Sequence, residues 1–205
     1  MAVKETSPHI VHLSKDKKLL SLLHTVEPYE LKKRKNVCVR LCASIMSQQL
    51  STRVADVIFK RFLALYDNAE PTAQQILDTS FETLRSIGLS NAKVNYVQNV
   101  ARHMLENKVD DKKLHKMTDE EVVAFLTTIK GVGRWTVEML LMFTLGREDV
   151  FAVDDLGIQQ AMTKLYKLDA TDKKALREKM LKLSAKWAPY RTYACFYLWK
   201  YKDSK

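Results

Sequence analysis

The fold is decided by a short stretch of sequence, Thr127-Thr128-Ile129-Lys130-Gly131-Val132-Gly133. It lies between two segments in which apolar residues recur at helical spacing, and it holds two of the chain's five glycines. Glycines permit a tight backbone turn and let backbone amides come close to a ligand. The second helix begins directly after the turn, so its first N–H groups and the positive end of its dipole lie there. The pattern predicts a glycine hairpin that can bind a phosphate.

The spacing in this hairpin differs from that of other phosphate-binding motifs. No strand precedes the glycines and no Gly-Lys-Ser/Thr follows them, so neither a P-loop nor a dinucleotide fingerprint is indicated. On a basic chain, two helices joined by a glycine hairpin suggest docking on a DNA backbone. From this pattern alone, an ordinary corner between two helices remains the alternative.

The rest of the chain also has helical spacing. Only 5 Gly and 4 Pro occur in 205 residues, which favours a mostly helical fold over a sandwich or barrel. We expect a first helix after Ser14, then helices over 37–46, 51–66, 81–87 and from Ser90 to about residue 105. Thr118 and Glu121 have the spacing of a capping box. One face of the 51–66 helix carries the apolar residues Val54, Val57, Ile58, Phe62 and Leu65.

Composition excludes several classes of protein. Hydrophobic residues make up 46% of the chain, enough for a core, and no apolar run has the length of a membrane span. Residues 1–17 have no apolar signal-peptide core, and 3 cysteines are too few for a disulfide framework. We therefore expect an intracellular protein, cytoplasmic or nucleoid-associated in a bacterium and nuclear in a eukaryote. The 34 basic and 24 acidic residues give a net charge of +10, which favours DNA or RNA as partner, with solubility as the alternative.

Four blocks of sequence occur in an order and spacing shared with one family. They are Ile45-Met46-Ser47-Gln48-Gln49-Leu50-Ser51, Ile129-Lys130-Gly131-Val132-Gly133-Arg134-Trp135-Thr136, Asp149-Val150-Phe151-Ala152-Val153-Asp154-Asp155-Leu156-Gly157-Ile158, and Trp187-Ala188-Pro189-Tyr190-Arg191-Thr192-Tyr193-Ala194 with Tyr197-Leu198-Trp199. Over roughly residues 37 to 201, the chain resembles the helix-hairpin-helix superfamily of DNA glycosylases. It is most similar to the alkylation-repair branch, 3-methyladenine DNA glycosylase II.

The resemblance implies an all-α fold of two lobes with the active-site cleft between them. One lobe would cover residues 37–145 and hold the hairpin at about 127–134. The other would combine residues 1–36 with 146–205 and carry the catalytic carboxylate. Some members end in four closely spaced cysteines that bind an iron–sulfur cluster, but only Cys195 lies in this region. No such cluster is therefore expected.

The resemblance also implies the activity. Members of the branch flip alkylated purines such as 3-methyladenine and 7-methylguanine out of double-stranded DNA. They then hydrolyse the N-glycosidic bond and leave an abasic site for base excision repair. Relatives that also cut the strand place a nucleophilic lysine two residues after the second hairpin glycine, where this chain has Trp135. No Schiff base can form there, so a monofunctional hydrolase without lyase activity is implied.

The paired aspartates Asp154 and Asp155 are the candidates for catalysis. An alkylated purine is cationic and leaves readily, so what the reaction needs is stabilisation of the positive charge on the sugar. The resemblance gives this role to Asp155, while Asp154 suits the N-cap of the helix that begins at Leu156. From the pair alone, helix capping is the better interpretation of both.

The flipped base needs an aromatic, largely apolar pocket, because a cationic base is attracted to the faces of aromatic rings. Trp135 and Trp199 match pocket aromatics of the family, with core packing as the alternative for each. Trp187 is assigned to the core. Further candidate walls are Tyr197, Met139 and Leu156, of which the last two replace aromatics found in some relatives.

The DNA contacts implied by the resemblance begin at the hairpin, where the amides of Gly131, Val132 and Gly133 would hold a phosphate. Candidate phosphate-binding cations are Lys130, where many members have proline, and also Arg134 and Lys93. Gln48 and Gln49 would reach the opposite strand, with helix capping as the alternative. The side chain that fills the gap left by the flipped base would come from Gly88-Leu89-Ser90-Asn91, with Leu89 and Asn91 as candidates.

No cofactor is required by this chemistry. In the family a monovalent cation, Na⁺ or K⁺, often binds hairpin carbonyls, which here would be those of Thr127, Ile129 and Val132. We expect a monomer that acts on DNA without a membrane. Two other functions stay open: a glycosylase for deaminated or oxidised bases, and a protein that binds DNA lesions without cutting.

Overall fold

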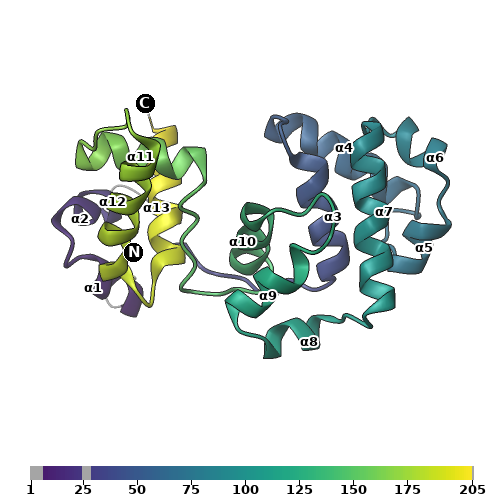
Figure 1. Ribbon diagram of the computed structural model, residues 1–205, viewed down its shortest axis with the longest axis horizontal. Coiled ribbons are helices and arrows are strands. Elements are labelled where there is room, and N and C mark those ends of the chain that lie inside the picture. Colours follow the sequence, from purple (N-terminus) through teal and green to yellow (C-terminus); the bar gives the residue numbers. More distant parts are fainter. Residues whose placement is uncertain (1–6, 25–28, 205) are drawn as a thin grey trace. The chain divides into compact units, whose positions relative to one another are not determined.

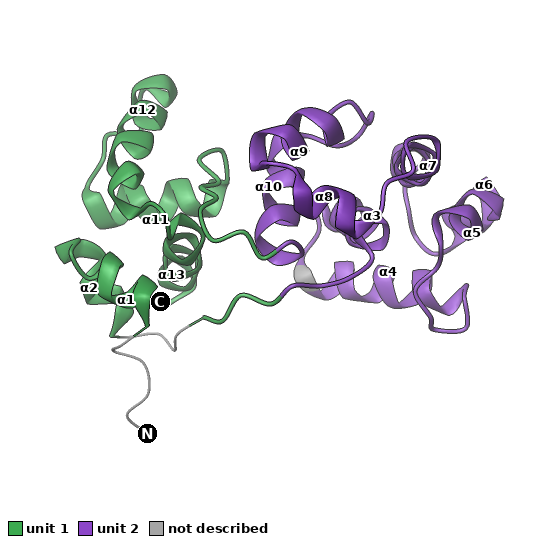
Figure 2. Ribbon diagram, turned by 90° about the horizontal axis from the view of Figure 1, so that it is seen from below, with its two compact units in different colours: residues 1–32, 146–205 green, residues 33–145 purple. Residues whose placement is uncertain are grey.

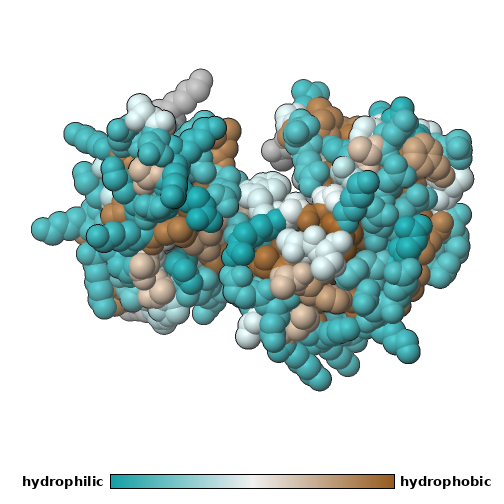
Figure 3. All heavy atoms as spheres, viewed as in Figure 1, coloured by the Kyte–Doolittle hydropathy of each residue, from teal (hydrophilic) through white to brown (hydrophobic). Residues whose placement is uncertain are grey.

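The computed structural model describes residues 7–24 and 29–204 (Figure 1). Residues 1–6, which belong to the segment predicted to lack a signal peptide, lie outside this part. Every regular element in the described ranges is a helix, which confirms the predicted all-α class. None of these helices is long and apolar enough to cross a membrane. Hydrophilic residues cover most of the face drawn in Figure 3.

The chain divides into two compact units, coloured separately in Figure 2. Unit 1 consists of Met1–Lys32 and Gly146–Lys205, and unit 2 of Lys33–Leu145. Unit 2 thus begins before Val37, where the sequence placed the boundary. The reason is that Arg34 N–H donates to the carbonyl of Thr144 at 2.8 Å, which joins the two ends of unit 2.

Eight helices of unit 2 are described: α3 (Val37–Ser47), α4 (Thr52–Ala64), α5 (Ala73–Asp78), α6 (Phe81–Ser86), α7 (Asn91–Glu106), α8 (Asp111–Lys116), α9 (Asp119–Leu126) and α10 (Arg134–Phe143). The central helix α3 packs against α4, α7 and α10. Its inner residues are fully buried, as expected for a helix surrounded by others, and this confirms the predicted buried helix. The N-terminus of α3 is capped from a distance, because the Asp111 carboxylate accepts from the N–H groups of Asn36 and Val37 at 2.8 and 2.9 Å.

Several helix ends in unit 2 confirm local sequence signals. Ser90 accepts from the Lys93 N–H at the start of α7, and Thr118 and Glu121 form both halves of a capping box at α9. Gly88 follows α6 with φ +108°, in the left-handed region that favours glycine. These signals are read correctly from sequence because each depends on residues within one turn of the helix end.

Helix α4 differs from the prediction in which residues it buries. Ile58 and Phe62 are buried as expected, but Val54 and Val57 are 44% and 43% exposed. The apolar face of α4 therefore extends beyond the part of the helix that packs on the core. Hydrophobic spacing identifies a helix and its inner face, but it does not show how far along that face the neighbouring helices reach.

Unit 1 is built from both ends of the described chain. Its helices are α1 (Pro8–Leu13), α2 (Lys17–Leu23), α11 (Leu156–Tyr166), α12 (Lys173–Ser184) and α13 (Arg191–Asp203), with a 3-10 turn, η1 (Ala185–Trp187). Helix α13 packs against α11 and α2. The sequence placed one helix after Ser14, whereas the structure has α1 before it and begins α2 after Asp16. Asp16 is the better cap, because its carboxylate accepts from the Lys18 N–H at 3.0 Å.

Asp16 is also the polar centre of unit 1. The residue is 7% exposed, and its carboxylate accepts from Tyr166 Oη at 2.6 Å, Trp187 Nε1 at 2.9 Å and Lys186 Nζ at 2.9 Å. Trp187 is 1% exposed, which confirms its assignment to the core. Burial raises the pKa of Asp16, but these hydrogen bonds outweigh it and lower the pKa to about 2.

Replacement of Asp16 should cost stability in a pH-dependent way. A depressed carboxylate pKa stabilises the fold above the unfolded pKa of 3.8, and this contribution is lost as the pH falls through about 2. Asp16→Asn should therefore lower the free energy of unfolding by about 2 kcal/mol at pH 7, and by less at pH 2. Urea unfolding of both proteins at the two pH values measures this.

The matched control for this prediction is Asp154→Asn, which removes a carboxylate paired with Arg177 at the surface of the same unit. Exposed pairs contribute little, so its effect should stay below about 1 kcal/mol. A difference between wild type and Asp16→Asn that is the same at both pH values would contradict the linkage.

Candidate functional site

The predicted hairpin joins α9 to α10 in unit 2. Gly131 has φ +104°, and the Val132 N–H donates to the Ile129 carbonyl at 3.0 Å, which closes the turn. Gly133 is the N-cap of α10 and has no side chain that could accept from the first turn. The positive end of the α10 dipole therefore lies at the hairpin, where an anion is stabilised.

The two hairpin glycines have different roles. A Cβ at Gly131 would lie 2.2 Å from Cγ of Tyr96, so this glycine lets the turn pack directly on an aromatic ring of α7. A Cβ at Gly133 would meet nothing within 4 Å. Gly131 is therefore required by packing and backbone conformation, whereas Gly133 leaves an open approach for a ligand.

The two basic residues next to the hairpin glycines also differ. Lys130 is exposed, and its carbonyl accepts from Asn99 Nδ2 at 3.3 Å. Arg134 binds both carboxylate oxygens of Glu120 on α9, at 3.2 and 2.7 Å, and its Nε donates to Glu138 at 3.1 Å. The structure thus keeps Lys130 as a phosphate-binding candidate, while Arg134 bridges the two hairpin helices.

The polar end of α3 lies beside the hairpin helix, because Gln48 Nε2 donates to Thr136 Oγ1 of α10 at 3.3 Å. Gln48 is half-buried, whereas Gln49 is exposed and has φ +58°. Lys93 was expected at a phosphate, but its ammonium donates to the carbonyls of Met46 and Gln48 at 2.9 and 2.8 Å. It closes the C-terminus of α3, and burial lowers its pKa.

The loop before α7 corrects another prediction. Leu89 was a candidate to fill the gap left by a flipped base, but it is 0% exposed and belongs to the core of unit 2. Ser90 is exposed and caps α7, and Asn91, the first residue of α7, is exposed. Asn91 therefore remains the candidate of the pair.

Helix α10 carries the predicted pocket residues of unit 2. Trp135 and Met139 are four residues apart, so they share one face of the helix, and both are half-buried. The hydrogen bond from Gln48 reaches Thr136, the neighbour of Trp135, and Tyr96 and Lys93 connect α7 to the hairpin and to α3. Unit 2 therefore brings together four of the predicted site segments: the hairpin, the end of α3, the start of α7 and the Trp135 face.

Asp155 lies at the start of α11 in unit 1. The predicted N-cap is Asp154, but in the structure it is Asp155, whose Oδ1 accepts from the Ile158 N–H at 2.9 Å. Asp154 instead accepts from Arg177 Nε at 3.0 Å. Helix α11 begins at Leu156, so the adjacent Asp155 is its N-cap.

The aromatic candidates of unit 1 separate in the structure. Trp199 on α13 is half-buried, and its indole Nε1 donates to Asp155 Oδ1 at 2.8 Å. Tyr197 is 1% exposed and lies in the core, so it is not an open wall of a pocket in this unit. Leu156 is 66% exposed beside Asp155. Unit 1 thus brings together Asp155, Leu156 and Trp199.

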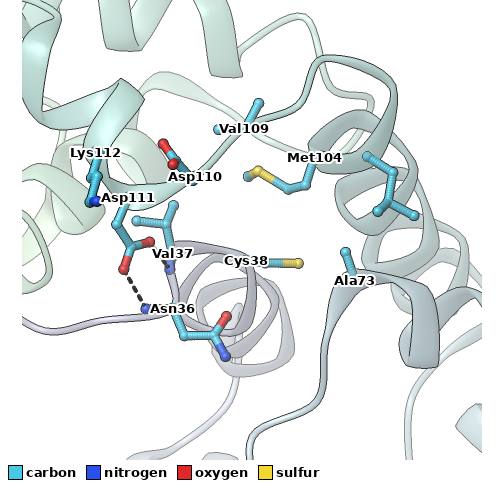
Figure 4. Close-up of a pocket in the computed structure, with 10 residues that line it drawn as sticks. Asn36, Val37, Cys38, Ala73, Met104, Val109, Asp110, Asp111 and Lys112 are labelled. Carbon is cyan, nitrogen blue, oxygen red and sulfur yellow. Dashed lines mark hydrogen bonds between the residues drawn. The ribbon is translucent and has the colours of Figure 1, made fainter.

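A hollow of about 410 Å³ lies at the other end of α3 (Figure 4). Its walls include Val37, Cys38 and Met104, with Asp110 and Asp111 at one side. Asp110 and Asp111 each accept from backbone N–H groups there, so both carboxylates act as helix caps. This hollow is formed by the N-terminal end of α3, while Gln48 lies at the C-terminal end, and it contains none of the predicted site residues.

Sequence reasoning missed three supports of the site. Tyr96 under Gly131 gives no local signal, because the contact joins distant parts of the chain. The Arg134–Glu138 pair has the i, i+4 spacing of a helical ion pair and could have been found from it. Gly157 was quoted without a role, although its neighbours are Asp155 and Trp199. In the described residues no group of three or more His, Cys, Asp or Glu is placed to hold a metal ion.

A helical chain with a glycine hairpin open to an anion and a carboxylate at a helix N-terminus fits a DNA-binding class of enzyme. The chain belongs to the HhH-GPD superfamily of base excision DNA repair proteins, which it matches over residues 42–186. This confirms the resemblance seen in the sequence.

Within this superfamily, the chain is similar to proteins named as 3-methyladenine DNA glycosylases. The chain is 37% identical to DNA-3-methyladenine glycosylase 1 of Schizosaccharomyces pombe, over 90% of this chain and 80% of that protein. The solved structure of the S. pombe 3-methyladenine DNA glycosylase in complex with abasic DNA superposes with a TM-score of 0.85 and 32% identity, covering 95% of this chain and 96% of that one. A DNA-3-methyladenine glycosidase from Bacillus halodurans gives a TM-score of 0.84 and 34% identity, over 97% and 91% of the two chains.

Proposed function

We propose that this protein is a monofunctional DNA glycosylase that flips alkylated purines, 3-methyladenine and 7-methylguanine, out of double-stranded DNA. It hydrolyses their N-glycosidic bond and leaves an abasic site for base excision repair. The observation that carries the proposal is the carboxylate of Asp155, held at the N-terminus of α11 by two hydrogen bonds. Relatives named 3-methyladenine glycosylases share this fold over nearly the whole chain.

The chemistry follows from the charge of the substrate. Alkylation at N3 or N7 makes the purine cationic, so the bond to C1′ breaks with both electrons leaving on the base, which departs neutral. Positive charge then develops on the sugar, and Asp155 stabilises it electrostatically. A water molecule adds to C1′ and loses a proton, which gives the abasic sugar.

The flipped base would meet aromatic faces. The candidates for this contact in unit 2 are Trp135 and Met139 on α10, and those in unit 1 are Trp199 and Leu156 near Asp155. Trp135 stands where lyases of the family have lysine, so the sugar is not captured as a Schiff base and the strand stays intact.

The hairpin would hold a DNA phosphate. The amides of Gly133 and the first turn of α10 lie at the open approach beside Gly133, and Lys130 is an exposed cation next to them. The Val132 amide, which was also expected at the phosphate, already donates to the Ile129 carbonyl within the turn. Gln48 and Gln49 at the end of α3 are assigned to the opposite strand. A Na⁺ or K⁺ ion would bind carbonyl oxygens of Thr127, Ile129 and Val132, since hard cations prefer oxygen ligands. The proposed repair reaction requires access to DNA, so we expect the protein in the nucleoid of a bacterium or the nucleus of a eukaryote.

Asn91 is the candidate to fill the gap left by the flipped nucleotide, because it is exposed at the first position of α7. A short polar side chain intrudes little between stacked bases, whereas an apolar wedge unstacks and kinks the duplex. Asn91→Leu should therefore bend lesion-containing DNA more than wild type does, by about 20° or more. Energy transfer between dyes at the two ends of a short duplex measures the bend. Equal bending by both proteins would remove Asn91 from this role.

The test of the proposed function is base release from methylated duplex DNA. Wild type should liberate 3-methyladenine and 7-methylguanine and leave strands that break only after treatment with alkali. Binding of damaged DNA without release of any base would instead indicate a lesion-binding protein. Release of deaminated or oxidised bases in place of methylated ones would indicate the other substrate class.

A further inference from the structure

We infer that Trp199 positions the Asp155 carboxylate through its indole N–H, and that Gly157 is a glycine because a side chain there would disrupt this contact. The inference rests on the proposed function, in which Asp155 stabilises charge on the sugar. It gives Trp199 a role that differs from stacking on the base, since the indole acts through another residue.

Two hydrogen bonds orient the carboxylate of Asp155. Oδ1 accepts from the Ile158 N–H at 2.9 Å and from Trp199 Nε1 at 2.8 Å. The first bond comes from helix α11 itself, and the second comes from α13. Two donors from different helices on one oxygen fix both the rotamer and the plane of the carboxylate, which a cap bond alone does not.

Another cap of unit 1 shows that the indole is additional to capping. Asp172 at the start of α12 accepts from the N–H groups of Lys174 and Ala175 at 2.8 and 3.1 Å, both in its own helix. Those bonds are sufficient to begin a helix. The bond from Trp199 therefore contributes orientation at Asp155 beyond what α11 needs.

Trp199 is itself held in place. It packs edge-to-face on Phe196, with ring centroids 5.7 Å apart at 73°, and Phe196 stacks on Tyr29 at 3.5 Å. The two helices that carry Trp199 and Asp155, α13 and α11, pack against each other. The indole N–H is thus directed by a packed helix pair and does not depend on a mobile side chain.

The absence of a side chain at Gly157 independently supports the positioning role of Trp199. A Cβ at this position would lie 3.1 Å from Asp155 Oδ1, 3.1 Å from Trp199 Cδ1 and 3.3 Å from Trp199 Nε1. These distances are shorter than ordinary van der Waals contacts, so a Cβ would displace the indole or the carboxylate by a few tenths of an ångström. Glycine is unfavourable within a helix, and the close approach of Trp199 explains its use here.

The inference is tested by a double-mutant cycle on the rate of base release under single turnover. Trp199→Phe removes the N–H but keeps an aromatic ring, and it should slow release by about 10- to 100-fold through a misplaced carboxylate. Affinity for duplex DNA with a non-cleavable abasic-site analogue should change by less than about threefold. In an Asp155→Asn background, Trp199→Phe should cause no further loss, because the charge it positions is already gone. Multiplicative losses would overturn the inference and make Trp199 a stacking residue.

The matched control is Trp187→Phe. Trp187 also donates an indole N–H to a carboxylate of unit 1, that of Asp16, at 2.9 Å. This variant should lose stability but release base at the wild-type rate per folded molecule. Gly157→Ala is a second variant at the site, and it should lower the release rate in the same direction as Trp199→Phe while keeping the indole. A wild-type rate for Gly157→Ala would contradict the steric argument.

A spectroscopic readout separates failure of this inference from failure of the proposed function. The chain has 3 tryptophans, so its indole N–H signals in a ¹H–¹⁵N spectrum can be assigned by single replacements with phenylalanine. Asp155→Ala should move the Trp199 signal and leave the Trp187 signal in place, whether or not the protein releases any base. An unmoved Trp199 signal overturns the inference. A moved signal in a protein without activity overturns only the proposed function.

Discussion

Asp155→Asn is expected to slow the release of 3-methyladenine by about 100- to 1000-fold, the usual cost of removing one electrostatic contribution to a transition state. The expected free energy of unfolding is nearly that of wild type. Asparagine is as good an N-cap as aspartate, and its Oδ1 can still accept from Ile158 and Trp199. The substitution therefore removes the charge and keeps the local structure, and the loss should appear in the chemical step.

Single-turnover release from methylated duplex DNA and urea unfolding measure the two quantities. The matched control is Asp172→Asn, which makes the same replacement at the N-cap of α12 in the same unit. It should have little effect on base release. A wild-type rate for Asp155→Asn would show that the carboxylate only caps α11, the interpretation that the aspartate pair alone favours.

Gly131→Ala has the second large effect, and it acts on the fold. Alanine at φ +104° is strained by about 1–2 kcal/mol, and its Cβ would overlap the ring of Tyr96, which adds about 1–3 kcal/mol. The free energy of unfolding should fall by about 2–5 kcal/mol, and DNA affinity should fall with it because the turn cannot keep its shape. When Gly131→Ala is combined with Tyr96→Ala, the part of the lost unfolding free energy that is due to the clash should be recovered.

Gly133→Ala is the comparison within the same turn. Gly133 has φ −94° and open space where a Cβ would stand, so alanine should cost stability only by about 0.5–1 kcal/mol as a poorer N-cap. The methyl group would obstruct the phosphate. DNA affinity should then fall by about tenfold, which corresponds to the loss of one charge-assisted hydrogen bond. Unfolding and DNA titration of the two variants should thus separate stability from binding. Equal stability losses would contradict the different roles given to the two glycines.

Much of the fold could be predicted from sequence because its signals are local. Ser90, the Thr118–Glu121 pair and Gly88 each act within one turn of a helix end, and the structure places them as expected. The hairpin glycines belong to the same kind of signal. An error of one residue at Asp154 and Asp155 shows the limit of such patterns, because two adjacent acids both suit a cap.

The parts that sequence could not supply depend on contacts between distant segments. Leu89 is 0% exposed, although its position in the loop between α6 and α7 suggested exposure. Lys93 is not available for the predicted phosphate contact, because its ammonium group donates to the carbonyls at the end of α3. A charged or apolar residue near a motif can contact DNA only where its tertiary partners leave it exposed.

The division of the chain also affects the order in which it folds during synthesis. Unit 2 is continuous, and the hydrogen bond between Arg34 and Thr144 joins its ends, so it can fold as soon as residue 145 has left the ribosome. Helix α2 is made before unit 2 but packs against α13, which is made after it. The burial of Leu19, Leu22 and Leu23 on α2 is therefore completed only after unit 2 has been made. Once unit 2 has folded, its joined ends shorten the effective loop between the two segments of unit 1. This lowers the entropic cost of bringing those segments together.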